Sequence, residues 1–282
     1  MKPVTIETVE TFVDQDINSR LGSHGRGVTG SYLQADRHAI VSERFQPIQP
    51  AMVGAELSKF NFSLVSLITG RGRHADKADF QRTVARYRST DSFEIEGLSL
   101  DLIYISKHMG RGQDEIRLGL YRGVCANQWA VGTLFDSVKF RHTGNALADL
   151  TEGFQRVLSQ RAKLVDAIER MRNTTLTADQ VTELAKEYAA IRLDGRENVV
   201  SVNYRSLGVV KRSEDAKLDL WTVANVLQEN TVRMPLEYAV NSTDKNGQPT
   251  IRHMHTRRLK DSSAQLVDLN GKLFDAALKR AA

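Results

Sequence analysis

The feature that most constrains the fold of this chain is a change in hydrophobic periodicity near residue 144. Before that point, apolar and polar side chains alternate over three runs, at 60–68, 93–106 and 115–124. A period of two with β-branched and aromatic residues is typical of half-buried β-strands. The sequence therefore predicts a sheet in this part of the chain.

Beyond residue 144 the apolar side chains repeat at the three-and-four spacing of a helix. Residues 145–172 predict one long amphipathic helix with Asn145 as its N-cap. Residues 177–191 begin with a capping-box pair, Thr177 and Gln180, and predict a second helix. Two more helices, a short extended piece and a turn are predicted at 215–231, 263–280, 235–240 and 244–249.

A strand-rich half followed by a helical half indicates an α+β fold. Residues 1–59 are loop-rich and dense in glycine, and Pro47 and Pro50 bracket an extended connection. No linker composition interrupts residues 60–282. We therefore expect an N-terminal segment over 1–59 and a single α+β domain over 60–282.

Composition bounds the class of protein. The chain has 282 residues, of which 41% are hydrophobic, and its formal net charge is +5. Such a chain can bury one large core or two smaller ones. The single cysteine, Cys125, excludes an internal disulfide and is typical of a reducing cytosol; we expect it to be a small buried side chain. A polar N-terminus and the lack of a membrane-length apolar run predict a soluble cytoplasmic protein with no membrane association.

The tripeptide Gly-Arg-Gly occurs at residues 25–27, 70–72 and 110–112. Glycine allows the backbone to approach a ligand closely, and arginine supplies a planar fork of permanently charged donors. The combination suits phosphate binding, although three surface loops with incidental arginines have the same pattern.

Cations and aromatic residues also interleave at 80–93 and 117–142. Cations neutralise phosphates and aromatic rings stack on unpaired bases, so this pattern favours a nucleic-acid surface. The alternative is that the aromatic residues, among them Trp129 and Phe140, fill the core and the cations form a solvated rim. The basic segment 71–90 fits either a helix or a ribbon. The candidate nucleic-acid-binding residues are Arg26, Arg71, Arg73, Arg82, Arg86, Tyr87, Arg88, Arg111, Arg117, Tyr121, Arg122, Lys139 and Arg141, with His142 beside the last two.

Enzymatic interpretations are weaker. The glycines of 22–31 lack the Gly-Lys-Ser/Thr of a phosphate-binding loop. His253 and His255 lie on one side of a possible strand but have no carboxylate or cysteine near them in sequence. Glu94 and Glu96 share a predicted strand face, as paired catalytic carboxylates do. No Glu-x-Lys element follows them to complete a nuclease-type metal site, and a solvated polar strand face explains the pair. We expect no catalytic residues, no metal and no cofactor.

Several motifs carry a family resemblance. His108-Met109-Gly110-Arg111, Arg122-Gly123-Val124-Cys125-Ala126-Asn127, Phe140-Arg141-His142-Thr143 and the Trp221/Asn225 pair follow one another in the order seen in a phage- and plasmid-borne family classed as a domain of unknown function. The chain resembles that family over roughly residues 60–280. Met109 and Arg111 stand where the family has aspartate and serine, so the resemblance implies no acidic role for this loop.

The size, the basicity and the same motifs are also similar to Drc, the single-stranded-DNA-binding RNA polymerase cofactors of bacterial viruses. That resemblance implies binding of single-stranded DNA without catalysis, a phage RNA polymerase as partner, and a fold other than the OB barrel. Our first hypothesis is therefore a sequence-tolerant single-stranded-DNA-binding cofactor in phage transcription or replication. An interaction protein that binds a host defence or nucleoid component is the alternative, and a nucleic-acid-processing enzyme is the third.

We also expect a homo-oligomer. The apolar stripe of residues 145–172 continues to Met171, farther than a compact core of this size readily covers. Proteins that follow a strand also gain affinity from several linked sites.

Overall fold

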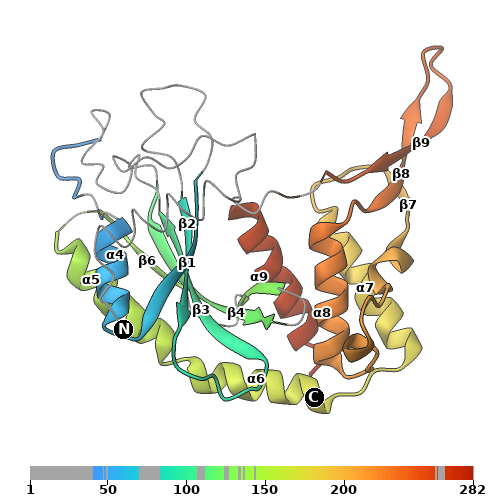
Figure 1. Ribbon diagram of the computed structural model, residues 1–282. Coiled ribbons are helices and arrows are strands. Elements are labelled where there is room, and N and C mark those ends of the chain that lie inside the picture. Colours follow the sequence, from blue (N-terminus) through green and yellow to red (C-terminus); the bar gives the residue numbers. More distant parts are fainter. Residues whose placement is uncertain are drawn as a thin grey trace. The chain divides into compact units, whose positions relative to one another are not determined.

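The computed structural model describes residues 41–46, 48, 50–69, 83–106, 112–123, 127–132, 135, 137–142, 144–257, 259 and 264–281 (Figure 1). The chain divides into two compact units, each assembled from segments that are distant in sequence. The first takes the described parts of 1–123, 135–161 and 261–264, and the second those of 124–134, 162–260 and 265–282. Strands dominate the N-terminal half and helices the C-terminal half, so the predicted α+β class is confirmed. Our expectation of a single domain over 60–282 stays a prediction.

The first unit is built on an antiparallel sheet in which neighbours in sequence are neighbours in space. Its strands follow the order β1-β2-β3-β4, and the short β6 pairs with the beginning of β4. A strand overlaps each of the predicted runs at 60–68, 93–106 and 115–124, although residues 93–97 form a loop before β3. The described end of the basic segment 71–90 is also a β-strand. The strands are β1 (Phe62–Thr69), β2 (Thr83–Ser89), β3 (Leu98–Ser106), β4 (Asp114–Arg122) and β6 (Val138–Phe140).

One face of this sheet is apolar and packs on helices. Residues that pair across antiparallel strands share a face, so the register Ala85–Tyr104–Ile116–Val138 defines a row on that face. Helix α5 (Ala146–Leu158) contacts β4 and β6, and α4 (Pro50–Ser58) contacts β1. The core residues Leu57, Leu102, Leu118, Leu150 and Phe154 are fully buried. Each such side chain contributes about 1.5–3 kcal/mol by leaving water, which makes this face the main support of the unit.

The predicted long helix over 145–172 is two helices. Helix α5 ends at Leu158 and α6 begins at Arg161 and runs to Asn173. The Ser159 hydroxyl donates to the carbonyl of Arg156 at 2.8 Å, and the Gln160 amide donates to Val157 in a tighter i→i+3 bond. Serine competes in this way with the helical ladder, which explains the interruption. Asn145 occupies the N-cap position of α5, but its side chain makes no capping bond.

The second unit contains most of the helices together with a small sheet of order β7-β8-β9. The predicted capping box is confirmed, because Thr177 and Gln180 bond reciprocally at the start of α7. The predicted turn is also present, with the Asp244 carboxylate accepting from the amides of Asn246 and Gln248. The elements are β5 (Asn127–Ala130), α6, α7 (Ala178–Arg192), β7 (Val199–Val202), 3₁₀ helices η4 (Tyr204–Gly208) and η5 (Ser213–Asp215), α8 (Leu220–Arg233), β8 (Glu237–Thr243), β9 (Pro249–His255) and α9 (Ala264–Leu278).

Helix α8 lies at the centre of this unit. The predicted helix at 215–231 begins later than expected, because Asp219 caps α8 by accepting from the Thr222 amide at 2.9 Å. Every residue from Leu220 to Thr231 is buried, including its polar ones. Tyr188 of α7 donates its hydroxyl to the Leu273 carbonyl of α9 at 2.9 Å. Among the described helices, none is long and apolar enough to cross a membrane.

Candidate nucleic-acid interface

The face of the first sheet opposite the helices carries most of its charge. The register aligns Arg86 with Arg117 through Ile103, Arg88 with Asp101, and Glu115 with Lys139. Alternate residues of one strand share a face, so Tyr121 also lies there. We call this surface the polar face. Its charged and aromatic members are Arg86, Arg88, Asp101, Glu115, Arg117, Tyr121 and Lys139.

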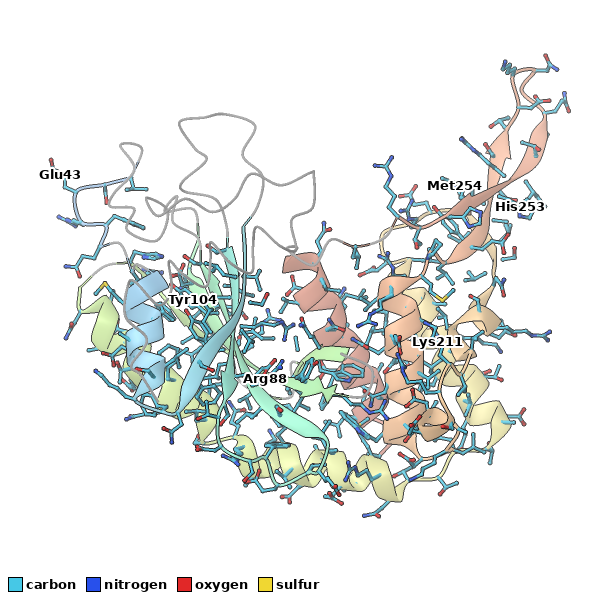
Figure 2. All side chains as sticks on the ribbon, viewed as in Figure 1. Glu43, Arg88, Tyr104, Lys211, His253 and Met254 are labelled. Carbon is cyan, nitrogen blue, oxygen red and sulfur yellow. The ribbon has the colours of Figure 1, made fainter. Side chains whose placement is uncertain are left out.

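Asp101 on β3 organises one side of the polar face. Its carboxylate is fully buried and accepts two hydrogen bonds from Arg88, at 2.8 and 3.2 Å. Figure 2 labels Arg88 on the sheet of the first unit. The Arg86 guanidinium also lies 3.9 Å from the same carboxylate. A bidentate bond fixes the plane of the Arg88 guanidinium. That plane lies over the Tyr121 ring, with the guanidinium carbon 3.5 Å from the ring centroid.

Glu115 and Arg117 form the other side of the polar face. They follow each other on one face of β4, and the Arg117 Nε lies 2.5 Å from a Glu115 oxygen. Burial of the Glu115 carboxyl favours its neutral form, but bonds from Arg117 and Ser137 and the charges of Arg117 and Lys139 outweigh burial. The pKa of Glu115 is therefore lowered, and the residue is ionised at neutral pH. Four cationic side chains thus share this face with two carboxylates, which leaves an excess of positive charge.

The polar face collects five of the predicted site residues, but they are not equally accessible. Arg86 is only 5% exposed and lies 3.9 Å from the Asp101 carboxylate, which leaves little of its side chain for the phosphate contact that we predicted. The side chains of Arg88 and Arg117 are 23% and 19% exposed, and Lys139 is exposed. Val84, Ile103 and Ile105 share this face and are buried. A strand bound here would therefore reach only the partly exposed Arg88, Arg117 and Tyr121 and the exposed Lys139.

Tyr87, which we predicted to stack on a base, is a buried residue. It lies on the apolar face between the two arginines of β2 and is 1% exposed. Burial raises the pKa of its hydroxyl far above the ordinary value. A base cannot reach this ring, so Tyr87 belongs to the core. Arg122, at the end of β4, is also on the apolar side and is partly exposed.

A cavity of 370 Å³ lies where β6 meets α5, and Lys139 and Arg141 are in its wall. Arg156 adds a third cation, while Asp149 and Glu152 bring two carboxylates. The cavity therefore extends the positive surface beyond the edge of the sheet without forming a strongly charged pocket. The remaining predicted residues, Arg26, Arg71, Arg73, Arg82 and Arg111, lie outside the described residues, as does Cys125.

His142, which sequence analysis grouped with Lys139 and Arg141, is instead part of a buried cluster. Its Nε2 lies 2.8 Å from Asp114 Oδ1, and its Nδ1 lies 3.1 Å from the Gln46 carbonyl oxygen. The Tyr104 hydroxyl donates to the other oxygen of Asp114, and Phe45 stacks on the imidazole at 4.5 Å. This cluster fastens residues 45–46 to the sheet. The sequence around His142 does not show its contact with Asp114, because Asp114 lies 28 residues away along the chain.

Two further candidates from the sequence are structural. Glu94 lies in the loop before β3, not on a strand, and pairs with Arg161 at 2.8 Å. Asn225 of the Trp221/Asn225 motif accepts from the Trp129 indole at 3.0 Å and donates to the Trp221 carbonyl at 2.7 Å. The motif therefore holds an aromatic cluster in the core of the second unit.

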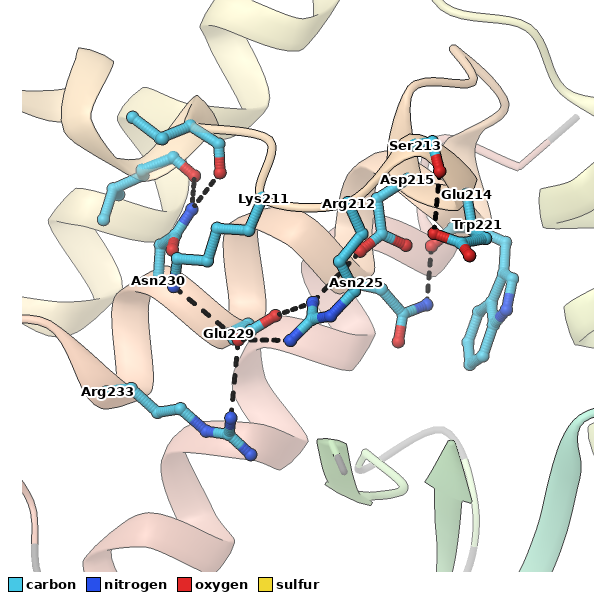
Figure 3. A network of polar contacts seen from close by, with 12 residues as sticks. Lys211, Arg212, Ser213, Glu214, Asp215, Trp221, Asn225, Glu229, Asn230 and Arg233 are labelled. Atoms are coloured by element: carbon cyan, nitrogen blue, oxygen red, sulfur yellow. Dashed lines mark hydrogen bonds and ion pairs between the residues drawn. The ribbon is translucent and has the colours of Figure 1, made fainter. Parts of the chain in front are cut away.

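Figure 3 shows a second charged cluster, in the second unit. Glu229 of α8 accepts two bonds from Arg212, at 2.7 and 3.1 Å, and lies 3.6 Å from Lys211 and 3.4 Å from Arg233. Arg212 also bonds Asp215 at 3.2 Å. The Arg212 bond, with the three cationic charges, lowers the pKa of Glu229 despite burial. The cluster joins the loop before α8 to the helix.

His253 and His255 lie on β9 and are exposed. Among the residues that the structure describes, no histidine, cysteine, aspartate and glutamate side chains gather closely enough to hold a metal ion.

Residues 37–268 match the family described as a domain of unknown function, DUF932. The chain belongs to the DUF932 family. Two curated Escherichia coli K12 proteins are similar to it, UPF0380 protein YafZ and UPF0380 protein YfjQ. Each is 25% identical over 207 residues, which cover 73% of this chain and 74% of the relative. No solved structure matches the chain. The DUF932 match begins before the first strand and includes the whole polar face and the Glu229 cluster.

Proposed function

We propose that this DUF932 protein binds single-stranded DNA on the polar face and catalyses no reaction on it. The observation that carries the proposal is the Arg88–Tyr121 pair, in which the guanidinium carbon lies 3.5 Å from the centroid of the aromatic ring, on a sheet face that carries more cations than carboxylates. Unpaired bases stack on both aromatic rings and guanidinium planes. The pair therefore presents the kind of platform that an unpaired base recognises.

The carboxylates support this function by ordering the cations. Asp101 fixes Arg88 and Glu115 fixes Arg117, so neither arginine loses much side-chain freedom when a strand binds. Groups that are ordered before binding reduce its entropic cost. Lys139 and Arg141 are exposed at the edge and supply less constrained charges for phosphates.

The arrangement favours sequence tolerance. Every base has a π-face, and cations contact phosphates that are the same in every sequence. We therefore propose little base preference and a preference for single strands over duplex, in which the faces of the bases are hidden.

The biological setting is a finer proposal that rests on the resemblance to bacterial-virus cofactors. We propose that the protein acts as a cofactor in phage transcription or replication, in the host cell cytoplasm, with a phage RNA polymerase as partner. We also propose a homo-oligomer, because linked sites multiply weak contacts along a strand. Light scattering that returns a mass close to the chain mass of 31.6 kDa at every protein concentration contradicts the oligomer.

Fluorescence anisotropy with matched single-stranded and duplex oligonucleotides, at two salt concentrations, tests the binding proposal. Tyr121→Ala should weaken binding to single strands by about 1–3 kcal/mol with little change in salt dependence, because stacking releases no counterions. Tyr121→Phe keeps the ring and should keep the affinity. Arg170→Gln, an exposed charge on α6, is the matched control for charge removal.

Three outcomes contradict the proposal: equal affinity for duplex and single strand, cleavage of the oligonucleotide, and a loss in Arg170→Gln as large as that in polar-face variants. A chain that binds neither form of DNA favours the alternative, an interaction protein that uses the same basic surface.

A further inference from the structure

Two arginines and a tyrosine of the second unit lie near the base of the β8–β9 hairpin, apart from the Glu229 cluster. Arg192 is the last residue of α7, and its Nη2 donates to the Arg257 carbonyl at 2.5 Å. Arg196 follows four residues later, and its guanidinium carbon lies 5.3 Å from the centroid of the Tyr238 ring on β8. The side chains of Arg192, Arg196 and Tyr238 therefore lie together beside the base of the hairpin.

Two donors of this group are buried without a partner. The Arg192 Nε and the Tyr238 hydroxyl are both enclosed and make no hydrogen bond within the described structure. Tyr238 is only 2% exposed. A buried donor that has lost water and gained no acceptor is costly, and nearly all such groups in proteins find one. Arg196 lies near both residues, since its charge acts on Arg192 and its guanidinium lies over the Tyr238 ring. Two unpartnered donors around one arginine point to an acceptor that comes from outside the chain.

The charge of the group is also unbalanced. Among the described residues, no carboxylate lies within ion-pair distance of Arg192 or Arg196. The nearby carboxylates are used elsewhere: Asp194 pairs with Lys272 at 2.6 Å and Glu187 pairs with Arg280 at 2.5 Å. Burial, and then the charge of Arg196, lower the pKa of Arg192. An anion between the two guanidinium groups would remove this repulsion.

A groove adjoins the group and shares Arg196 with it. The groove has a volume of 560 Å³ and lies between α7 and the edge strand β7. Its wall is mainly apolar, with Leu193 and Val199 among its residues, and Tyr204 and Lys186 add a ring and a cation. Pockets for small organic ligands have volumes of about 300–1,000 Å³. The groove therefore has room for an organic group attached to an anion at Arg196.

We infer that Arg192, Arg196 and Tyr238 bind a phosphate group, and that the groove between α7 and β7 takes the rest of a phosphorylated ligand. Guanidinium and hydroxyl donors suit the oxygens of a phosphate, and the arginine fork matches its geometry. Arg196 is the member of the group that lines the groove. The inference does not rest on the proposed function, because it uses none of the residues of the polar face. A free nucleotide and the terminal phosphate of a nucleic-acid strand share this chemistry.

Titration calorimetry and thermal unfolding of the full chain test the inference. The probes are inorganic phosphate, adenosine monophosphate, and one single-stranded oligonucleotide prepared with a 5′-phosphate or a 5′-hydroxyl. The phosphate probes should bind saturably and raise the melting temperature. Arg196→Gln and Tyr238→Phe should each weaken this binding about tenfold, the effect of losing one hydrogen bond to a charged group. Arg170→Gln should leave the binding unchanged.

The Tyr238→Phe variant separates ligand binding from a structural role. Its hydroxyl has no partner in the chain, so its removal should not lower the melting temperature of the free protein. A hydroxyl with only a structural role would lower that temperature and leave phosphate affinity unchanged, and this result would overturn the inference.

The probes also identify the source of the phosphate. Tighter binding of adenosine monophosphate than of inorganic phosphate supports a nucleotide in the groove, and tighter binding of the 5′-phosphate oligonucleotide than of the 5′-hydroxyl form supports a strand end. No saturable binding of any phosphate probe at millimolar concentration overturns the inference, as does binding that both variants leave intact. Failure of the polar-face proposal would appear instead with the 5′-hydroxyl oligonucleotide, which carries no terminal phosphate.

Discussion

At the scale of single residues, the polar face depends most on Asp101. Its buried carboxylate orients Arg88 and partly neutralises the positive charge of Arg86. Asp101→Asn keeps the shape but leaves two partly buried guanidinium groups without their charged acceptor. Removing one member of such a pair should lower the free energy of unfolding by about 3 kcal/mol. Urea unfolding of this variant measures the effect, with Asp166→Asn, an exposed carboxylate on α6, as the control. A loss no larger than that of the control would contradict the assignment.

Glu229 gives a prediction on pH. Its pKa in the folded chain is lowered, chiefly by the Arg212 bond, from an ordinary value of 4.5. The stabilisation is therefore fully present above the unfolded pKa and is lost as the pH falls through the folded pKa. The difference in unfolding free energy between the wild type and Glu229→Gln should be constant near neutral pH and shrink below about pH 4.5. Urea unfolding across this range measures it.

The control for this prediction is Glu197→Gln, because Glu197 is exposed. Its substitution should give only a small difference in unfolding free energy, because an exposed side chain makes few contacts. A Glu229→Gln difference that grows as the pH falls has the wrong sign and would reject the lowered pKa.

The residues of the candidate site were only partly predictable. The interleaving of cations with aromatic residues over 80–93 and 117–142 identified the cations, because it is a local property of the sequence. It could not show that Tyr87 is buried while Tyr121 lies under Arg88, because that depends on which face the distant helix α5 covers. Nor could it show that Asp101, from another strand, holds Arg88.

At the scale of elements, Gly153 controls how closely α5 approaches β6. A Cβ atom at Gly153 would lie 2.9 Å from Cγ1 of Val138, closer than such contacts occur. Alanine normally stabilises a helix interior by about 1 kcal/mol relative to glycine. Here the clash should reverse the sign, so Gly153→Ala should lower the melting temperature. Circular dichroism during heating measures it.

Two variants decide whether the clash is the cause. Gly208→Ala adds a methyl group where nothing lies within 4 Å, so it should be neutral or slightly stabilising. Val138→Ala in the Gly153→Ala background makes room for the new methyl and should recover part of the loss. If Gly153→Ala stabilises the chain, the close packing of α5 on β6 is incorrect.

Most helices, strands and turns could be predicted from the sequence, and the one break that was not predicted has a local cause. Strand alternation, the Thr177 capping box and the turn after Thr243 all depend on short-range chemistry, and all are present. The break at Ser159 was missed because the apolar stripe runs through it without interruption. A serine that bonds back to Arg156 is a weak signal beside that stripe.

At the scale of the whole molecule, periodicity was enough to predict the α+β class. It could not predict two compact units whose segments alternate along the chain, because no linker composition marks where the chain passes from one to the other. The apolar stripe over residues 145–172 is covered within the chain itself. Phe154 and Val157 are buried in α5, and Leu164, Ile168 and Met171 are buried in α6. An oligomer is therefore not needed to cover the stripe, and the proposal of one rests on the advantage of linked sites.

The salt dependence of DNA binding shows how much of the molecule takes part. Each phosphate contact with a single strand contributes about 0.7 to the slope of log affinity against log salt. The accessible cations of the polar face and its edge, Arg88, Arg117, Lys139 and Arg141, should therefore give a slope of about 3. The five arginines predicted from sequence alone should raise it to about 6, and replacing all five with glutamine should return it to about 3. These are Arg26, Arg71, Arg73, Arg82 and Arg111.

Anisotropy titrations over a range of salt concentrations measure both slopes. A slope near 3 in the wild type would mean that the five arginines do not contact the strand, and the described sheet surface would then be the whole interface. A slope near zero would contradict electrostatic binding by any of these residues. A slope that stays near 6 after all five arginines are replaced would place the additional contacts elsewhere, and the phosphate site at Arg192 and Arg196 would be the first to test, with Arg196→Gln expected to lower it by about 0.7.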